Sequence, residues 1–282
     1  MASRTRVLIV DDSALMRQLL STLLAADPEI EVVGTAPDPF VAREKIKELN
    51  PDVVTLDVEM PHMDGVTFLR KIMTLRPMPV VMISTLTQAG AEITLEALEI
   101  GAVDFVAKPT SDIAAAMNSL GGELQTKVKA AARTRIGARR AASAPAQPRR
   151  ERLNRSTGKI VAVGASTGGV EALKTLLMGL PPDCPPIIIT QHMPPRFTTA
   201  FAQRLDRECP MAVSEAAHNM PIEAGHAYIA PGSHHLELAR ASGKFVCALH
   251  EEAPVSGHRP SVDVLFRSVA KIAGASAIGV IL

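Results

Sequence analysis

A serine and a histidine in the second half of the chain have the types and spacing needed for nucleophilic catalysis. Ser166 lies in a glycine-lined turn, 164–169, between an apolar run typical of a buried strand and a helical pattern at 170–177. His192 ends the next apolar run, 186–192. Strand–helix–strand units of this length form parallel strands, and neighbours ~4.8 Å apart would bring both side chains together at one sheet edge. We therefore interpret Ser166 as a nucleophile and His192 as its general base.

Both residues also have simpler interpretations. A serine before a helix is often its N-cap, and His192 could belong to a surface loop. A dinucleotide-binding turn is disfavoured, because the G-x-G-x-x-G pattern requires glycine at position 166. The histidines show no spacing typical of zinc ligands, although His234 and His235 lie in a loop that could shape a substrate cleft.

A second set of polar residues ends the apolar runs of the first half. These runs alternate with helical patterns, which predicts a parallel sheet covered on both faces. Functional groups gather at the carboxyl ends of such strands, and here the ends carry Asp11, Asp12, Asp57, Ser84 and Lys108. The predicted strands are 6–10, 31–34, 52–57, 78–84 and 103–109, and helices are expected after the first strand and near 40–50, 65–75 and 88–100.

The three carboxylates at this edge would repel one another unless a cation lay among them. Oxygen ligands suit Mg²⁺, which favours phosphate partners. Lys108 supplies a second positive charge, and the Ser84 hydroxyl can donate to a phosphate oxygen. A single strand-end aspartate is usually a turn or cap residue, but the ordered set favours transfer of a phosphoryl group to a carboxylate.

Residues 5–122 resemble the receiver domain of bacterial two-component response regulators, a flavodoxin-like fold with a five-stranded parallel sheet. The resemblance implies that Asp57 accepts the phosphoryl group from a histidine kinase. It also implies that Asp12, Asp57 and the backbone carbonyl of Glu59 hold Mg²⁺, with Asp11 in support. The switch hydroxyl, the switch aromatic residue and the lysine of that family correspond to Ser84, Phe105 and Lys108.

Composition and length bound the organisation of the chain. Its 282 residues, 47% of them hydrophobic, are enough for two domains. We expect a receiver at 1–122, a helical tail and Arg/Ala/Pro-rich linker at 123–157, and a second domain at 158–282. The linker region holds eight arginines between 133 and 155 but no interleaved aromatic residues, and the net charge is only +1, so we expect no nucleic-acid partner.

The cysteines and the apolar runs indicate in which cellular compartment the protein is expected. Three cysteines, odd in number and far apart, argue against a disulfide framework and fit a reducing cytosol. No signal peptide is evident, and no apolar run approaches the ~20 residues that span a bilayer. We expect a soluble, cytoplasmic monomer without membrane insertion.

The second half is similar to the catalytic domain of the chemotaxis protein-glutamate methylesterase (CheB) family, in the segments 163–169, 191–193, 228–232 and 259–266. With the receiver and linker, the resemblance covers nearly the whole chain. It implies a doubly wound α/β domain that hydrolyses glutamate γ-methyl esters on chemoreceptors, releases methanol and deamidates receptor glutamines, without a cofactor. Phosphorylation would activate it by moving the receiver away from the catalytic cleft.

The same resemblance assigns roles and exposes a departure. Ser166 would attack the carbonyl, His192 would carry the proton, and the Thr167 backbone N–H would face the oxyanion. The family's triad aspartate follows a strand like 278–282, so we expect it beyond Leu282; Asp263 is a poor substitute. The chain as written is therefore expected to be incomplete, and inactive or unstable by itself. The alternative function is a non-catalytic, phospho-switched module that docks on receptors or the kinase.

Overall fold

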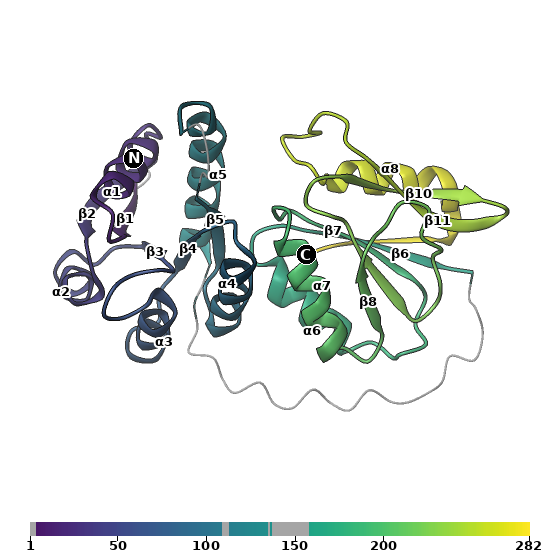
Figure 1. The fold of residues 1–282 in the computed structure, drawn as a ribbon, viewed down its shortest axis with the longest axis horizontal. Helices are drawn as coiled ribbons and strands as arrows, with labels where there is room; N and C mark the ends of the chain where they lie inside the picture. The colour runs from purple at the N-terminus through teal and green to yellow at the C-terminus, as the bar shows by residue number, and fades with distance from the viewer. Residues whose placement is uncertain (1–3, 109–112, 135, 137–157) are drawn as a thin grey trace. The chain divides into compact units, whose positions relative to one another are not determined.

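The computed structural model describes residues 4–108, 113–134, 136 and 158–282. The chain divides into two compact units, Met1–Ala141 and Ala142–Leu282, each containing a parallel sheet with helices (Figure 1). The predicted fold class is confirmed in both units. Among the described residues, no helix has the length and apolar character needed to cross a bilayer.

The first unit is built on a five-stranded sheet in the order β2-β1-β3-β4-β5, with every neighbouring pair parallel. The chain reverses its direction of strand addition between β1 and β3, and this topological switch point is where ligands bind in open α/β sheets. Asp11 and Asp12 follow β1, and Asp57 ends β3. The strands are β1 Thr5–Val10, β2 Ile30–Ala36, β3 Val53–Asp57, β4 Val80–Ser84 and β5 Asp104–Ala107.

Polar caps fix where the helices of this unit begin. Ser13, Asp38, Asp64 and Thr87 each accept a hydrogen bond from a backbone N–H of the first turn that follows, and each such cap contributes about 1 kcal/mol. The predicted helix 40–50 ends where Asn50 adopts a left-handed conformation. The helices are α1 Ala14–Ala25, α2 Pro39–Leu49, α3 Gly65–Leu75, α4 Gln88–Ile100 and α5 Ile113–Arg133.

Helix α5 belongs to the first unit over its length. It continues through Gly121 and Gly122, so the expected receiver boundary at 122 falls inside a helix. Leu124 and Val128 are fully buried in a cluster with residues of α1 and the strands. A Cβ at position 121 would lie 3.2 Å from Leu23, so glycine permits the close approach of α1 and α5. Most of the expected linker, from 137 to 157, lies outside the described residues.

The second unit has a five-stranded sheet in the order β12-β6-β7-β9-β8, again parallel throughout, and an antiparallel hairpin of β10 and β11. Strands β6 and β7 are neighbours, as predicted, in the register Ala165 to Gln191. The strands are β6 Ile160–Ala165, β7 Ile187–Gln191, β8 Ala212–Glu215, β9 His226–Ile229, β10 His235–Ala241, β11 Lys244–His250 and β12 Ala277–Ile281.

Helices cover both faces of this second sheet. Helix α8 (Val262–Ala273) and the hairpin lie on one face, and α6 (Gly169–Met178) and α7 (Phe197–Glu208) on the other (Figure 1). Leu265 and Val269 of α8 join the buried cluster of β6, β7 and β9, and the Ser268 hydroxyl accepts a hydrogen bond from the Leu238 N–H at 2.9 Å. This packing holds the sheet edge that carries Ser166.

Candidate functional sites

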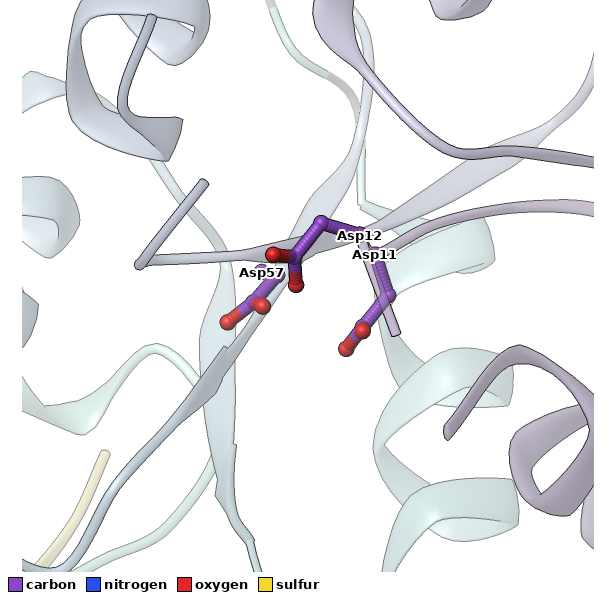
Figure 2. A group of neighbouring side chains, drawn as sticks. All are labelled: Asp11, Asp12 and Asp57. Carbon is purple, nitrogen blue, oxygen red and sulfur yellow. The ribbon is translucent and has the colours of Figure 1, made fainter. Parts of the chain in front are cut away.

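Three carboxylates converge at the carboxyl edge of the first sheet. Figure 2 shows Asp11 and Asp12, adjacent in the chain, facing Asp57 across this edge, and their nearest oxygens all lie within 4.8 Å of one another. Asp11 and Asp57 are buried, whereas Asp12 is exposed. The sequence placed these residues at one edge, and the structure brings them together.

Lys108 is the positive charge of this cluster. Its Nζ lies 2.7 Å from Asp57 Oδ2 and 3.2 Å from Asp11 Oδ2. Burial raises the pKa of the Asp57 carboxyl to about 6, the Asp11 charge adds to this effect, and the Lys108 hydrogen bond opposes it. Burial alone would lower the pKa of Lys108, but the hydrogen bond and charge of Asp57 outweigh it and raise that pKa. At neutral pH the site therefore holds an ionised, poorly solvated carboxylate.

Replacing Asp57 with asparagine should stabilise the metal-free first unit. An acid whose pKa is higher in the folded state destabilises the fold where it is ionised, and this cost disappears as the pH falls toward the unfolded value. We expect Asp57→Asn to raise the free energy of unfolding by about 1–3 kcal/mol near pH 7.5, and the gain to fall by roughly half near pH 5. Urea unfolding in a chelator measures it. A gain that grew as the pH fell would contradict this account.

The residues expected to form a phosphorylation switch lie around the cluster. Ser84 is buried, and its hydroxyl is hydrogen-bonded to that of Thr94 on α4 at 2.7 Å. Phe105 is also buried, and Lys127 Nζ lies 5.0 Å from its ring centre. Thr94 was missed by the sequence reasoning, because a threonine inside a helix gives no signal of a contact with a strand. The switch roles remain predictions.

The donor set at this edge fits a hard divalent cation. The converging ligand atoms are carboxylate oxygens without nitrogen or sulfur, the chemistry that Mg²⁺ prefers. The Glu59 N–H donates to Asp57 Oδ1 at 3.3 Å, which fixes the loop that carries the Glu59 carbonyl. A hollow of about 780 Å³, lined by Asp12 and Glu59 among others, leaves room for water and a phosphodonor.

The second site joins Ser166 and His192 across neighbouring strands. The His192 N–H donates to the Ala165 carbonyl at 3.1 Å, which continues the β6–β7 ladder to the sheet edge. There His192 Nδ1 lies 3.2 Å from Ser166 Oγ. Ser166 is exposed and His192 is partly buried. The two residues therefore have the geometry that a nucleophile and its general base require.

The conformation of the turn leaves the Ser166 hydroxyl available. Gly168, with a φ of 77°, occupies the N-cap position of α6, and no side chain caps this helix. The interpretation of Ser166 as the N-cap is therefore wrong. The Gly169 N–H donates to the Ser166 carbonyl at 2.8 Å and closes the turn. Thr167 lies between these residues, and its oxyanion role remains a prediction.

Two contacts near His192 could not be expected from the sequence. The His258 ring stacks on the His192 ring with centres 3.8 Å apart and planes 4° apart. A Cβ at position 164 would lie 2.4 Å from Val262, so the start of α8 presses against the strand that precedes Ser166. His258 and Val262 belong to one segment that precedes and opens α8, and only the tertiary fold places that segment over the site.

The other residues considered from the sequence have structural partners. His234 Nε2 lies 3.0 Å from Glu251 Oε1. His235 is fully buried, and its Nδ1 accepts a hydrogen bond from the Ser261 N–H at 3.2 Å, so it holds the segment before α8 in place. Asp263 is exposed and accepts from the Ser256 hydroxyl.

Comparison with known proteins follows the division into two units. The response regulator receiver domain model matches residues 7–118, and the CheB methylesterase model matches residues 161–282. A solved structure of the Thermotoga maritima CheB methylesterase catalytic domain is similar, with 39% identity, a TM-score of 0.43, and coverage of 44% of this chain and 67% of that chain.

Relatives match the whole chain. A protein-glutamate methylesterase/protein-glutamine glutaminase of Cupriavidus pinatubonensis is 54% identical over 283 residues, covering 100% of this chain and 80% of that protein. One from Pseudomonas aeruginosa is 56% identical over 268 residues, covering 95% of this chain and 76% of that protein. Both carry the same two-activity name.

Proposed function

This chain belongs to the CheB methylesterase family, and we propose that Ser166 and His192 carry out its ester hydrolysis and glutamine deamidation. The observation that carries the assignment is the 3.2 Å contact between Ser166 Oγ and His192 Nδ1 at the edge of the sheet. The substrates are glutamate γ-methyl esters and glutamines on the cytoplasmic parts of chemoreceptors. The relatives, 54% and 56% identical, carry the methylesterase/glutaminase name, which supports this substrate chemistry.

The proposed reaction has two stages. Ser166 Oγ bonds to the ester carbonyl carbon while its proton passes to His192 Nδ1, and the oxygen that becomes anionic faces the Thr167 backbone N–H. Collapse breaks the bond to the methoxy group, which takes the proton from His192 and leaves as methanol; for glutamine the leaving group is ammonia. Water then attacks the acyl carbonyl carbon and gives a proton to His192. As the bond from the acyl carbon to Ser166 Oγ breaks, His192 returns this proton to Oγ, and glutamate and free Ser166 are released.

A triad acid would reach this site from the strand beside β6. Strand β12 is parallel to β6, and the Leu282 N–H donates to the Gly164 carbonyl at 3.0 Å. A residue that follows Leu282 would therefore leave the sheet at the edge that carries Ser166. This geometry supports our expectation that the aspartate that orients His192 lies just beyond Leu282.

The first unit is a receiver, and receivers are phosphorylated, typically with Mg²⁺. We propose Asp57 as the acceptor, with Asp12, Asp57 and the Glu59 carbonyl holding Mg²⁺ and Asp11 in support. The metal would neutralise charge on the incoming phosphoryl group. Lys108 would pair with that group, and the Ser84 hydroxyl, which accepts from the Thr94 hydroxyl, would donate to a phosphoryl oxygen. A chemotaxis histidine kinase supplies the phosphoryl group, and the modification relieves inhibition of the esterase.

The His192 assignment has a direct test. In the full-length protein, His192→Gln should lower methanol release from methylated receptor membranes by about 10²- to 10⁴-fold, because general base catalysis is lost. The control is His218→Gln: exposed His218 accepts a hydrogen bond from the Leu249 N–H, and the glutamine carbonyl can accept the same bond. A His192→Gln enzyme as fast as the control would refute the assignment, and the non-catalytic docking module would then be favoured.

A further inference from the structure

The side chain of Gln191 lies between the backbones of the two proposed catalytic residues. Its Nε2 group donates to the Ser166 carbonyl at 2.9 Å and to the His192 carbonyl at 3.3 Å. Both acceptors are carbonyl oxygens, so only the amide nitrogen can occupy this position. One primary amide therefore joins the nucleophile turn to the base.

This link continues the strand pairing beyond the end of the ladder. Ala165 and Gln191 are register partners in the β6–β7 ladder. The last backbone hydrogen bond between the two strands runs from the His192 N–H to the Ala165 carbonyl. The Gln191 amide connects the next carbonyl on each strand. The Ser166 carbonyl also accepts from the Gly169 N–H at 2.8 Å, so the same oxygen closes the turn and receives the amide. A change at Gln191 would be transmitted to the turn and to the loop that begins at His192.

The residues around the Gln191 amide leave a space that fits it. Gln191 is only 3% exposed, and Gly169 leaves room for it: a Cβ at position 169 would lie 2.1 Å from Gln191 Oε1. Within the described part of the chain, Oε1 has no hydrogen-bond partner. A buried oxygen without a partner is unfavourable, so the place of the amide rests on its two Nε2 hydrogen bonds. An apolar side chain would avoid that cost but would lose both donors.

We propose that Gln191 is a positioning residue for the esterase: its amide fixes the spacing between Ser166 Oγ and His192 Nδ1 from the backbone side. It does not touch the substrate. The inference rests on the proposed function, since it concerns the geometry of that same pair. Catalytic groups must be held within ~0.5 Å of the productive geometry, and a misplacement of about 1 Å can cost about 10²-fold in rate.

The test uses two replacements in the full-length protein. Gln191→Met keeps the length of the side chain and removes both donors, and Gln191→Glu keeps its shape but turns carboxylate oxygens toward two carbonyls. The matched control is Thr190→Val on the same strand, because the Thr190 hydroxyl is buried and lacks a hydrogen-bond partner among the described residues. For each variant, kcat and KM for methanol release and the thermal midpoint are measured.

We expect both Gln191 variants to lower kcat by about 10- to 100-fold, with KM and the thermal midpoint close to those of Thr190→Val. In a Ser166→Ala background, Gln191→Met should lower the residual rate no further. Wild-type kcat in either Gln191 variant, a rise in KM without loss of kcat, or unfolding of both would overturn the proposal. A fully active Ser166→Ala enzyme would instead refute the proposed function, whatever Gln191→Met does.

Discussion

Replacing Ser166 with alanine should lower methanol release by about 10⁴-fold or more, because the acyl-enzyme route is lost entirely. The hydroxyl is exposed, makes no cap for α6 and lies 3.2 Å from His192 Nδ1. Alanine removes only the oxygen, and the turn is held by hydrogen bonds from the Gly169 N–H and the Gln191 side-chain amide to the backbone carbonyl of residue 166, which alanine keeps. The fold and KM should therefore change little while kcat collapses.

The measurement is the initial rate with methylated receptor membranes, using full-length protein that carries a phosphodonor-activated receiver. Thr175→Ala is the matched control, since it removes an exposed hydroxyl from the helix that follows the turn. Equal rates for Ser166→Ala and Thr175→Ala would remove Ser166 from the mechanism and favour the interpretation of a docking module.

Asp57→Asn should abolish stimulation of the esterase by a phosphodonor while leaving the unstimulated rate intact. An amide cannot accept a phosphoryl group as a carboxylate does, and the asparagine still fits a site where Lys108 and Asp11 remain paired. The esterase residues lie in the second unit, so their chemistry is not touched. The expected result is a ratio of stimulated to basal rate near one.

The control for this experiment is Asp52→Asn, which changes a carboxylate just before the opposite end of β3. Asp52 is exposed, and its Oδ2 accepts a hydrogen bond from the Arg6 N–H, a bond that the asparagine oxygen can keep. This variant should respond to the phosphodonor like wild type. If Asp57→Asn responded equally well, phosphorylation at Asp57 would not be the trigger.

The sequence predicted the positions of functional residues best where they lie at the carboxyl ends of strands. Periodicity predicts the strands, parallel sheets place their carboxyl ends at one edge, and the residues there are then neighbours whatever the loops do. This reasoning anticipated the contacts between Lys108 and Asp57 and between His192 and Ser166, and both are present. The same logic predicted that β6 and β7 would be adjacent.

Contacts that depend on tertiary packing were not predictable in this way. His258 is 66 positions from His192 in the sequence, and its stacking follows only from how the segment before α8 folds back. Gln191 gave no signal beyond its place before His192, because a side-chain bond to a backbone carbonyl leaves no trace in the pattern of residue types. The continuation of α5 through Gly121 and Gly122 was not predictable either, since glycine disfavours helix interiors, and the close approach of Gly121 to Leu23 of α1 is seen only in the fold.

The central claim is that Ser166 and His192 act as one unit, and a double-mutant cycle on kcat tests it most directly. The rates of Ser166→Ala, His192→Gln and the double variant are compared with wild type under full activation. Residues that act together lose their effect together, so the double variant should be no slower than Ser166→Ala alone, within about 2-fold. If the fold-loss in kcat of the double variant equalled the product of the two single-variant losses, the two residues would act independently, and the pairing would be contradicted.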